Sequence, residues 1–286
     1  MWISEGTFTG AGSGPEIAWK TWTPDGEPTA VVVLAHGAGE HMGRYEHLVA
    51  ALTASDIALH ALDHRGHGTS DGPRGVVDRL TNAADDVAHL VDEAAAAHPN
   101  LPVFLLGHSM GGTIALVQAL DRPAPLAGLI LSAPALTLGS GPLPLRLLAR
   151  TRVVPLLLSA LRPELGMLQL DPQGISSDPA AVAEYEADPL VFHGRLPART
   201  TVEIAEFILG PFRQRTGELR LPFLAMHGMD DPITPCAAAE TAYALAGSAD
   251  KTLKRYPGAF HELFNEVPEL RELALAELVD WIRARS

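Results

Sequence analysis

The sequence predicts an α/β protein with a mostly parallel sheet, helices on both faces of that sheet and an inserted helical cap. Short, nearly continuous apolar segments of strand length alternate with longer helical segments, which is typical of parallel sheets covered on both sides. This alternation stops after Pro134 and resumes at Leu221. The composition, with 47% hydrophobic and 19% charged residues in 286, is that of a globular protein large enough to bury a core without disulfides.

The strand segments are short and rich in β-branched residues. Residues 30–35 read AVVVLA, the near-continuous apolar pattern of a strand buried on both faces. The other expected strands are 57–62, 103–106, 128–131, 222–226 and 252–256. The expected helices are 44–54, 83–98, 113–120, 236–246 and 269–285.

A long segment interrupts this pattern. From about residue 136 to 220 the chain is rich in Leu, Pro and Arg and has no clear strand. An insertion that leaves a sheet and returns to it is typical of a cap. We therefore expect a core made of residues 1–136 and 220–286, and a cap or lid made of residues 137–219.

A candidate nucleophile lies between an expected strand and an expected helix. Gly107-His108-Ser109-Met110-Gly111 matches G-x-S-x-G, and the strand–turn–helix setting is the one that a nucleophile elbow requires. Ser109 is therefore the expected nucleophile. The alternative is a glycine-rich turn with an incidental serine.

A serine nucleophile needs a base, and the base needs an orienting group. Elbows of this type are followed by the acid and then by the histidine. Asp231, at the end of an expected strand in a H-G-x-x-D pattern, is the expected acid, and the neighbouring Asp230 is the expected solvated turn residue. His261, on a glycine-containing loop before the last helix, is the expected base.

Acyl transfer also needs backbone N–H donors for the developing oxyanion. One donor is normally the residue after the nucleophile, here Met110, and the other lies in the loop after an early strand. We assign Ala38 in the loop His36-Gly-Ala-Gly-Glu-His41 as this second donor.

The histidines near Asp63 raise the alternative of a metal site. His60, His64 and His67 are close to it in sequence, but a hydrogen-bonded loop is the simpler interpretation. His89 and His98 belong to an expected helix and are expected at its surface. The chain has one cysteine and no His-x-x-x-His pattern on an expected helix, so no metal and no organic cofactor are expected.

These motifs together resemble the monoacylglycerol lipases of the α/β-hydrolase superfamily. The most specific one is the decapeptide His36-Gly-Ala-Gly-Glu-His-Met-Gly-Arg-Tyr45. The others are DHRGHGTS at 63–70, GHSMGG at 107–112, LSAP at 131–134, HGMDD at 227–231 and GAFH at 258–261.

The resemblance implies a polar pocket for a glycerol moiety. Its positions in this chain are Glu40, Arg44, His108 and Tyr185, the last within a Tyr-Glu-Ala-Asp-Pro-Leu segment of the cap. For Glu40 and Arg44 a surface ion pair is the alternative. The resemblance is weak between residues 139 and 170, so no residue role is inferred from the family there.

The expected activity is hydrolysis of monoacylglycerol to glycerol and fatty acid through an acyl-enzyme. A general carboxylesterase, a lysophospholipase and a peptidase of the proline-iminopeptidase type are alternatives on the same fold. A non-enzymatic binding protein is disfavoured because such proteins typically lack a triad member. No pattern in the sequence indicates an oligomeric state.

Net charge and hydropathy limit the kinds of partner that the protein is expected to have. The net charge of -13 argues against nucleic-acid binding. The first residues do not resemble a signal peptide, and no apolar stretch is long enough to span a bilayer, so we expect a cytoplasmic protein. Residues 137–170 combine many leucines with Arg146, Arg150 and Arg152, which favours peripheral contact of the cap with membranes or lipid droplets. Packing of these leucines against the core is the alternative.

Overall fold

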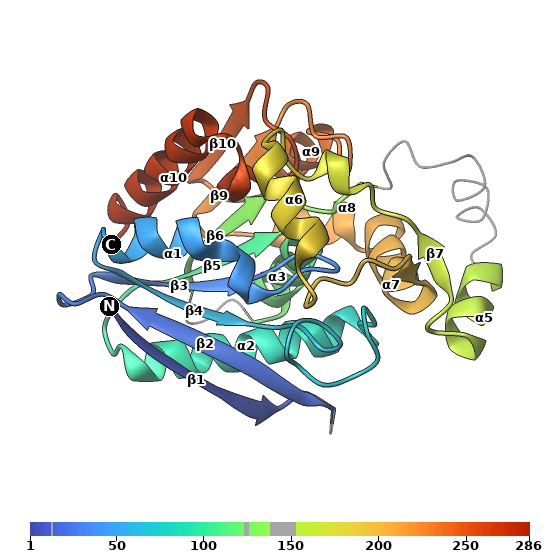
Figure 1. Cartoon of the computed structure of the whole chain (residues 1–286). Coiled ribbons are helices and arrows are strands. Elements are labelled where there is room, and N and C mark those ends of the chain that lie inside the picture. The colour runs from blue at the N-terminus through green and yellow to red at the C-terminus, as the bar shows by residue number, and fades with distance from the viewer. Residues whose placement is uncertain (13, 123–125, 138–152) are drawn as a thin grey trace.

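The computed structural model describes residues 1–12, 14–122, 126–137 and 153–286, and its centre is one eight-stranded sheet (Figure 1). The strand order is β1-β2-β4-β3-β5-β6-β9-β10. In this order, β4, β3, β5, β6, β9 and β10 run parallel to one another, and β1 and β2 are antiparallel to their neighbours. Their bounds are β1 Trp2–Thr9, β2 Glu16–Thr23, β3 Ala30–Ala35, β4 Ile57–Leu62, β5 Val103–His108, β6 Leu126–Ser132, β9 Phe223–Gly228 and β10 Lys251–Tyr256.

Helices cover both faces of the sheet, as the sequence predicts (Figure 1). One face packs against α2 (Leu80–Ala97), α3 (Met110–Asp121) and α9 (Ala237–Leu245). The other face packs against α1 (Glu46–Thr53) and α10 (Pro268–Arg283). Short 3₁₀ turns lie at Met42–Tyr45, Pro172–Gly174, Thr216–Glu218 and Leu263–Asn265.

The central strand β3 explains why the strand segments are continuously apolar. All six of its residues are buried. Val31 and Val33 belong to the core on one face, whereas Val32 and Leu34 belong to the core on the other. Because alternate side chains point to opposite faces, a strand covered on both sides needs apolar residues at every position.

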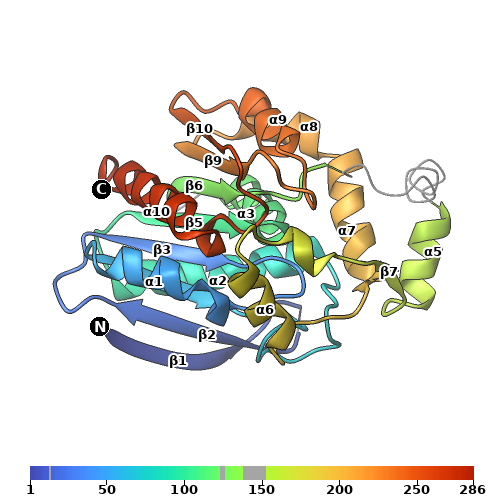
Figure 2. The same ribbon diagram turned by 45° about the horizontal axis from the view of Figure 1, so that its top comes forward.

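The first two strands were not expected from the sequence. In β1 no side chain is fully buried, and Trp2 and Ile3 are exposed. β1 forms the edge of the sheet, where only β2 pairs with it (Figure 2). An edge strand with polar and apolar residues on both faces lacks the buried pattern that marks the other strands.

The segment between β6 and β9 contains α5 (Val153–Leu161), α6 (Pro179–Ala187), α7 (Ala198–Leu209) and α8 (Phe212–Arg215). It also contains β7 (Gly166–Leu168) and β8 (Leu196–Pro197), which pair as a small antiparallel sheet. The expectation of a segment without strands was therefore wrong. Strands of three and two residues are too short to produce a recognisable alternation. In Figures 1 and 2, α5, α7 and β7 lie at the right, and α6 lies closer to the main sheet.

Candidate active site

The turn between β5 and α3 holds Ser109 in a strained backbone conformation, with φ 52° and ψ -118°. Non-glycine residues adopt such angles only where the surroundings enforce them. A Cβ on Gly111 would lie 2.0 Å from the carbonyl oxygen of Ala35, and one on Gly107 would lie 2.4 Å from that of Gly111. Only glycine fits at these two positions, so the sharp turn needs both of them.

Asp231 and His261 are in direct contact, although they come from different loops. Asp231 follows β9 and His261 follows β10, and these strands are parallel neighbours. The Nδ1 of His261 lies 2.7 Å from Oδ2 of Asp231. Asp230 is exposed and its carboxylate accepts the N–H of Gly258 at 2.9 Å. Asp231, not Asp230, is therefore the aspartate that can orient His261.

Two residues that the sequence analysis did not assign also hold Asp231. Thr234 donates its hydroxyl to Oδ2 and its backbone N–H to Oδ1, both at 2.9 Å. His227 places Nε2 3.1 Å from Oδ2 and 2.8 Å from the carbonyl of Thr234. The histidine of the H-G-x-x-D pattern is the signal that could have indicated this second contact.

These contacts determine the protonation of the pair. Burial opposes ionisation of Asp231, but the charge of His261 and the hydrogen bonds from His227, His261 and Thr234 outweigh it and hold its pKa far below the usual range. Burial acts to lower the pKa of His261, but the charge and hydrogen bond of Asp231 outweigh burial and raise it. A carboxylate that stays ionised beside a more basic imidazole can stabilise the imidazolium.

The loop after β3 lies against Ser109. A Cβ on Gly37 would lie 3.1 Å from the Cβ of Ser109, so the backbone passes directly beside this serine. Ala38 is half-buried in the same loop, and Met110 is the first residue of α3. The first N–H groups of a helix have no acceptor within the helix, so that of Met110 is available to a ligand.

Glu40 and Arg44 form an ion pair, but it is buried and not at the surface, so the alternative of a surface ion pair is wrong. Their side chains are only 4% and 7% exposed. Glu40 Oε1 accepts hydrogen bonds from Gly37 N at 2.5 Å and Tyr45 Oη at 2.7 Å. Arg44 donates from Nη2 to Glu262 at 2.6 Å. Glu262 is a further site residue that the sequence analysis missed.

His108 and Tyr185 complete this cluster. His108 Nε2 lies 3.9 Å from Glu40 Oε1, and its ring centroid lies 4.8 Å from that of His261. The guanidinium carbon of Arg44 lies 4.8 Å from the centroid of the Tyr185 ring, so α6 brings Tyr185 over Arg44.

Two polar atoms in this cluster lack hydrogen-bond partners although they are buried: Oε2 of Glu40 and Nε of Arg44. They lie 3.7 Å apart. Burial, together with the negative charge of Glu262, raises the pKa of Glu40 to about 7. The two atoms face each other as an ion pair covered by protein, so the charge of Arg44 is shared between Glu40 and Glu262.

The loop after β4 is a hydrogen-bonded structure, as expected. Asp63 accepts hydrogen bonds from the backbone of Met42 and Thr69, both at 2.8 Å. His98 was expected at the surface; it is half-buried instead, because its ring packs against that of His60 at 5.4 Å. Among the described residues no group of His, Cys, Asp and Glu is arranged to hold a metal ion.

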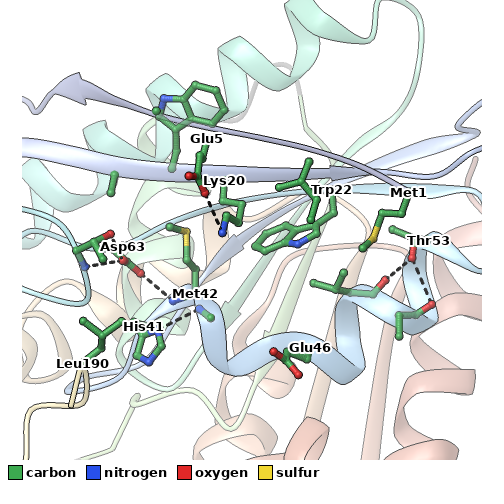
Figure 3. A pocket seen from close by; sticks show the side chains of 18 of the residues that line it. Met1, Glu5, Lys20, Trp22, His41, Met42, Glu46, Thr53, Asp63 and Leu190 are labelled. Atoms are coloured by element: carbon green, nitrogen blue, oxygen red, sulfur yellow. Dashed lines mark hydrogen bonds and ion pairs between the residues drawn. The ribbon is translucent and has the colours of Figure 1, made fainter. Parts of the chain in front are cut away.

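A separate groove of about 1270 Å³ lies between the β1–β2 ribbon and α1 (Figure 3). Its lining includes the ion pair of Lys20 with Glu5, together with Trp22 and Met42. Neither Ser109 nor His261 lines it, so this groove is not part of the candidate active site.

Comparison with known proteins identifies the family. The family model described as "Serine aminopeptidase, S33" matches residues 26–268, and solved relatives share the α/β-hydrolase fold. The chain belongs to this family. A monoacylglycerol lipase from Mycolicibacterium smegmatis is 41% identical over 98% of this chain and 96% of its own length. The human monoglyceride lipase is 35% identical over 96% of this chain and 88% of its own length.

A solved structure of this family has the same architecture. A soluble variant of the Saccharomyces cerevisiae monoglyceride lipase, in complex with a substrate analogue, superposes with a TM-score of 0.86. It is 25% identical and covers 99% of this chain and 95% of its own. No helix among the described parts of the chain has both the length and the apolar character needed to cross a bilayer.

Proposed function

We propose that the protein is a serine hydrolase that cleaves monoacylglycerols to glycerol and a fatty acid. The observation that carries this proposal is the buried cluster of Glu40, Arg44 and Glu262, which adjoins the Gly37 loop and the expected base His261. A polyol ester offers hydroxyls to such a cluster, whereas a simple alkyl or aryl ester does not. The names of the two curated relatives agree with this substrate class.

In the proposed mechanism Ser109 Oγ attacks the ester carbonyl while Nε2 of His261 takes its proton. Asp231 keeps Nδ1 of His261 protonated and stabilises the imidazolium. The N–H groups of Ala38 and Met110 donate to the oxyanion. The tetrahedral intermediate collapses, the C–O bond to glycerol breaks, and His261 gives its proton to the leaving oxygen. Water then attacks the acyl-enzyme with His261 as base, which releases the fatty acid and frees Ser109.

The direct test measures glycerol released from monoacylglycerol micelles and labelling by a fluorophosphonate probe. The wild type is expected to release glycerol and to be labelled, and Ser109→Ala is expected to do neither while keeping its thermal stability. Labelling without release of glycerol would still indicate a serine hydrolase but would exclude monoacylglycerol as its substrate. The same assay with a lysophospholipid, a short aryl ester and an aminoacyl amide distinguishes the lysophospholipase, carboxylesterase and peptidase alternatives.

The proposed glycerol pocket has its own test. Glu40→Ala and Tyr185→Phe are expected to lower kcat/KM for monoacylglycerol about 5- to 100-fold more than for an aryl ester, because losing the partner of a buried hydroxyl costs about 1–3 kcal/mol. Glu184→Gln, an exposed neighbour of Tyr185 on α6, is the control and is expected to change neither value. Equal losses on both esters would exclude a pocket that binds the glycerol moiety.

We further propose that the segment between β6 and β9 acts as a cap that contacts lipid surfaces. Its outer part exposes a cluster of leucines, with Leu157 and Leu161 exposed by 55% and 74%. Leu156, Leu165 and Leu209 are each at least 41% exposed. Exposed leucines gathered on α5 and its neighbours are suited to the boundary between headgroups and acyl chains. The arginines expected to meet anionic headgroups, Arg146, Arg150 and Arg152, lie outside the described residues.

Co-sedimentation with liposomes tests this contact. The double variant Leu157→Gln/Leu161→Gln is expected to lose most of the lipid-bound fraction, because each burial of a leucine contributes about 1.5–3 kcal/mol. Leu273→Gln on α10, which is 50% exposed and far from α5 in Figure 1, is the matched control. Binding that survives the double variant would leave packing as the only role of these leucines. An Arg146/Arg150/Arg152→Gln variant on vesicles with and without anionic lipid tests the charge contribution.

A further inference from the structure

The residue after the proposed catalytic base, Glu262, has a buried carboxylate that the proposed mechanism does not use. Its side chain is 7% exposed. Oε2 accepts hydrogen bonds from Arg44 Nη2 at 2.6 Å and from Asn265 Nδ2 at 2.8 Å. Its backbone N–H donates to the carbonyl of Ile175 at 2.7 Å. Glu262 is therefore held in one position by three different parts of the chain.

The cluster of Glu40, Arg44 and Glu262 has an uneven charge balance. Arg44 is the guanidinium of the cluster, and it faces two carboxylates, those of Glu40 and Glu262. Tyr45 donates to Glu40, and the ring of Tyr185 covers Arg44. The charge of Arg44 is thus already balanced by protein groups, and the cluster is neutral or negative according to whether Glu40 is protonated.

We propose that Glu262 is a specificity-determining residue that excludes anionic alcohol moieties, above all phosphate esters, from the proposed glycerol site. This inference rests on the proposed function and deepens it, because it restricts the substrates to esters of uncharged polyols. Without Glu262, Arg44 would keep Glu40 as its ion-pair partner, but its Nη2 would be free to donate to a phosphate.

Two physical reasons support this role. A phosphate binds well to a guanidinium that can offer it two parallel N–H donors, and Glu262 already occupies one end of the Arg44 guanidinium. A second anion placed next to Glu40 and Glu262 would also be repelled in a site shielded from water.

The test compares kcat/KM for a monoacylglycerol with that for the lysophosphatidic acid of the same acyl chain. The wild type is expected to prefer the monoacylglycerol by at least about 100-fold, and Glu262→Gln is expected to reduce this preference by at least about tenfold. Glu262→Asp keeps the charge and should retain the preference within about threefold. Glu184→Gln removes an exposed carboxylate and is expected to leave the ratio unchanged.

A second measurement on the wild type keeps the inference testable if Glu262→Gln fails to fold or if monoacylglycerol is not the substrate. Glycerol and glycerol 3-phosphate are compared as inhibitors of aryl ester hydrolysis, and the phosphate is expected to inhibit at least about tenfold more weakly. Equal inhibition by both, or an unchanged substrate ratio in folded Glu262→Gln, would overturn the role of Glu262. Failure of monoacylglycerol hydrolysis with the expected inhibition pattern would overturn only the proposed substrate.

Discussion

At the residue scale, the site depends on how completely Asp231 is hydrogen-bonded. Its Oδ1 accepts the backbone N–H groups of Ile233 and Thr234. Its Oδ2 lies within hydrogen-bond distance of Nδ1 of His261, the hydroxyl of Thr234 and Nε2 of His227. A carboxylate with this many donors stays ionised, so it can keep a neighbouring imidazole in one tautomer and one orientation.

Asp231→Asn should therefore lower kcat by about 10⁴, because an amide cannot hold Nδ1–H of His261 in the same way. Asp230→Asn is the matched control, because Asp230 is exposed and its carboxylate accepts a hydrogen bond from the Gly258 N–H, away from His261. We expect it to change kcat by less than about twofold. Steady-state kinetics on an aryl ester measures both. An inactive Asp230→Asn beside an active Asp231→Asn would show that the acid had been assigned to the wrong aspartate.

The backbone of Ser109 makes a second prediction possible. Its φ of 52° costs about 1–3 kcal/mol in a non-glycine residue, and glycine adopts such angles without this cost. Ser109→Gly should be more stable than Ser109→Ala by about 1 kcal/mol, and both should be inactive. Urea unfolding of the two variants measures the difference. A less stable glycine variant would show that this turn is not strained.

At the scale of elements, the loop between β10 and α10 is fixed by Glu266, which is fully buried. Its Oε1 accepts the N–H groups of Phe260 at 2.6 Å and Ser177 at 3.1 Å. Its Oε2 accepts the hydroxyl of Ser177 at 2.5 Å. One carboxylate thus joins the backbone beside His261 to the segment before α6, which carries Tyr185.

Removing this carboxylate takes the acceptor from three N–H groups, those of Ser177, Phe260 and Val267, at a cost of about 1–3 kcal/mol for each that stays unsatisfied. Glu266→Ala should lower the free energy of unfolding by about 3 kcal/mol and also lower kcat, because Phe260 precedes His261. Ser177→Ala should cost only about 1 kcal/mol, and Glu269→Ala, exposed on α10, should cost almost nothing. Denaturant unfolding and aryl ester kinetics report the two effects. An unchanged kcat in folded Glu266→Ala would limit this residue to a role in stability.

At the scale of the whole molecule, buried histidines dominate the response to acid. Burial lowers the pKa of His36 and His67 to about 3, and that of His60 to about 4. Burial also lowers the pKa values of His64 and His108. In the unfolded chain these groups titrate near 6.5. Below that pH the unfolded state binds more protons than the folded state, so acid favours unfolding.

The melting temperature should therefore be highest above pH 6.5 and should fall steadily as the pH decreases toward about 4. Glu40, Asp86 and His261 act in the opposite direction: their pKa values are raised, so their contributions are present at low pH and are lost as the pH rises. Three such groups do not offset five buried histidines. Calorimetry from pH 8 to 4 tests this, with His89→Gln, an exposed histidine, as the control. A melting temperature that stays constant down to pH 4.5 would contradict it.

Local patterns in the sequence were sufficient to predict several features of the fold and of the site. A strand buried on both faces must be apolar at each position, so residues 30–35 and 57–62 were predicted with their observed bounds. The glycines around Ser109 indicated a sharp turn because only glycine allows so close an approach of backbone. The spacing after His227 selected Asp231 over Asp230, and the structure brings Asp231 into contact with His261.

The tertiary structure alone decided what depends on long-range contacts. Glu262 pairs with Arg44 across 218 positions, and Glu266 reaches Ser177 across 89, so no local pattern indicated either contact. The edge strand β1 and the short pair β7–β8 are defined by their partners, since their own sequences have no buried face or are too short to show one. Local sequence sets the backbone geometry and the spacing of buried residues, whereas the charge balance of a site arises only when distant segments meet.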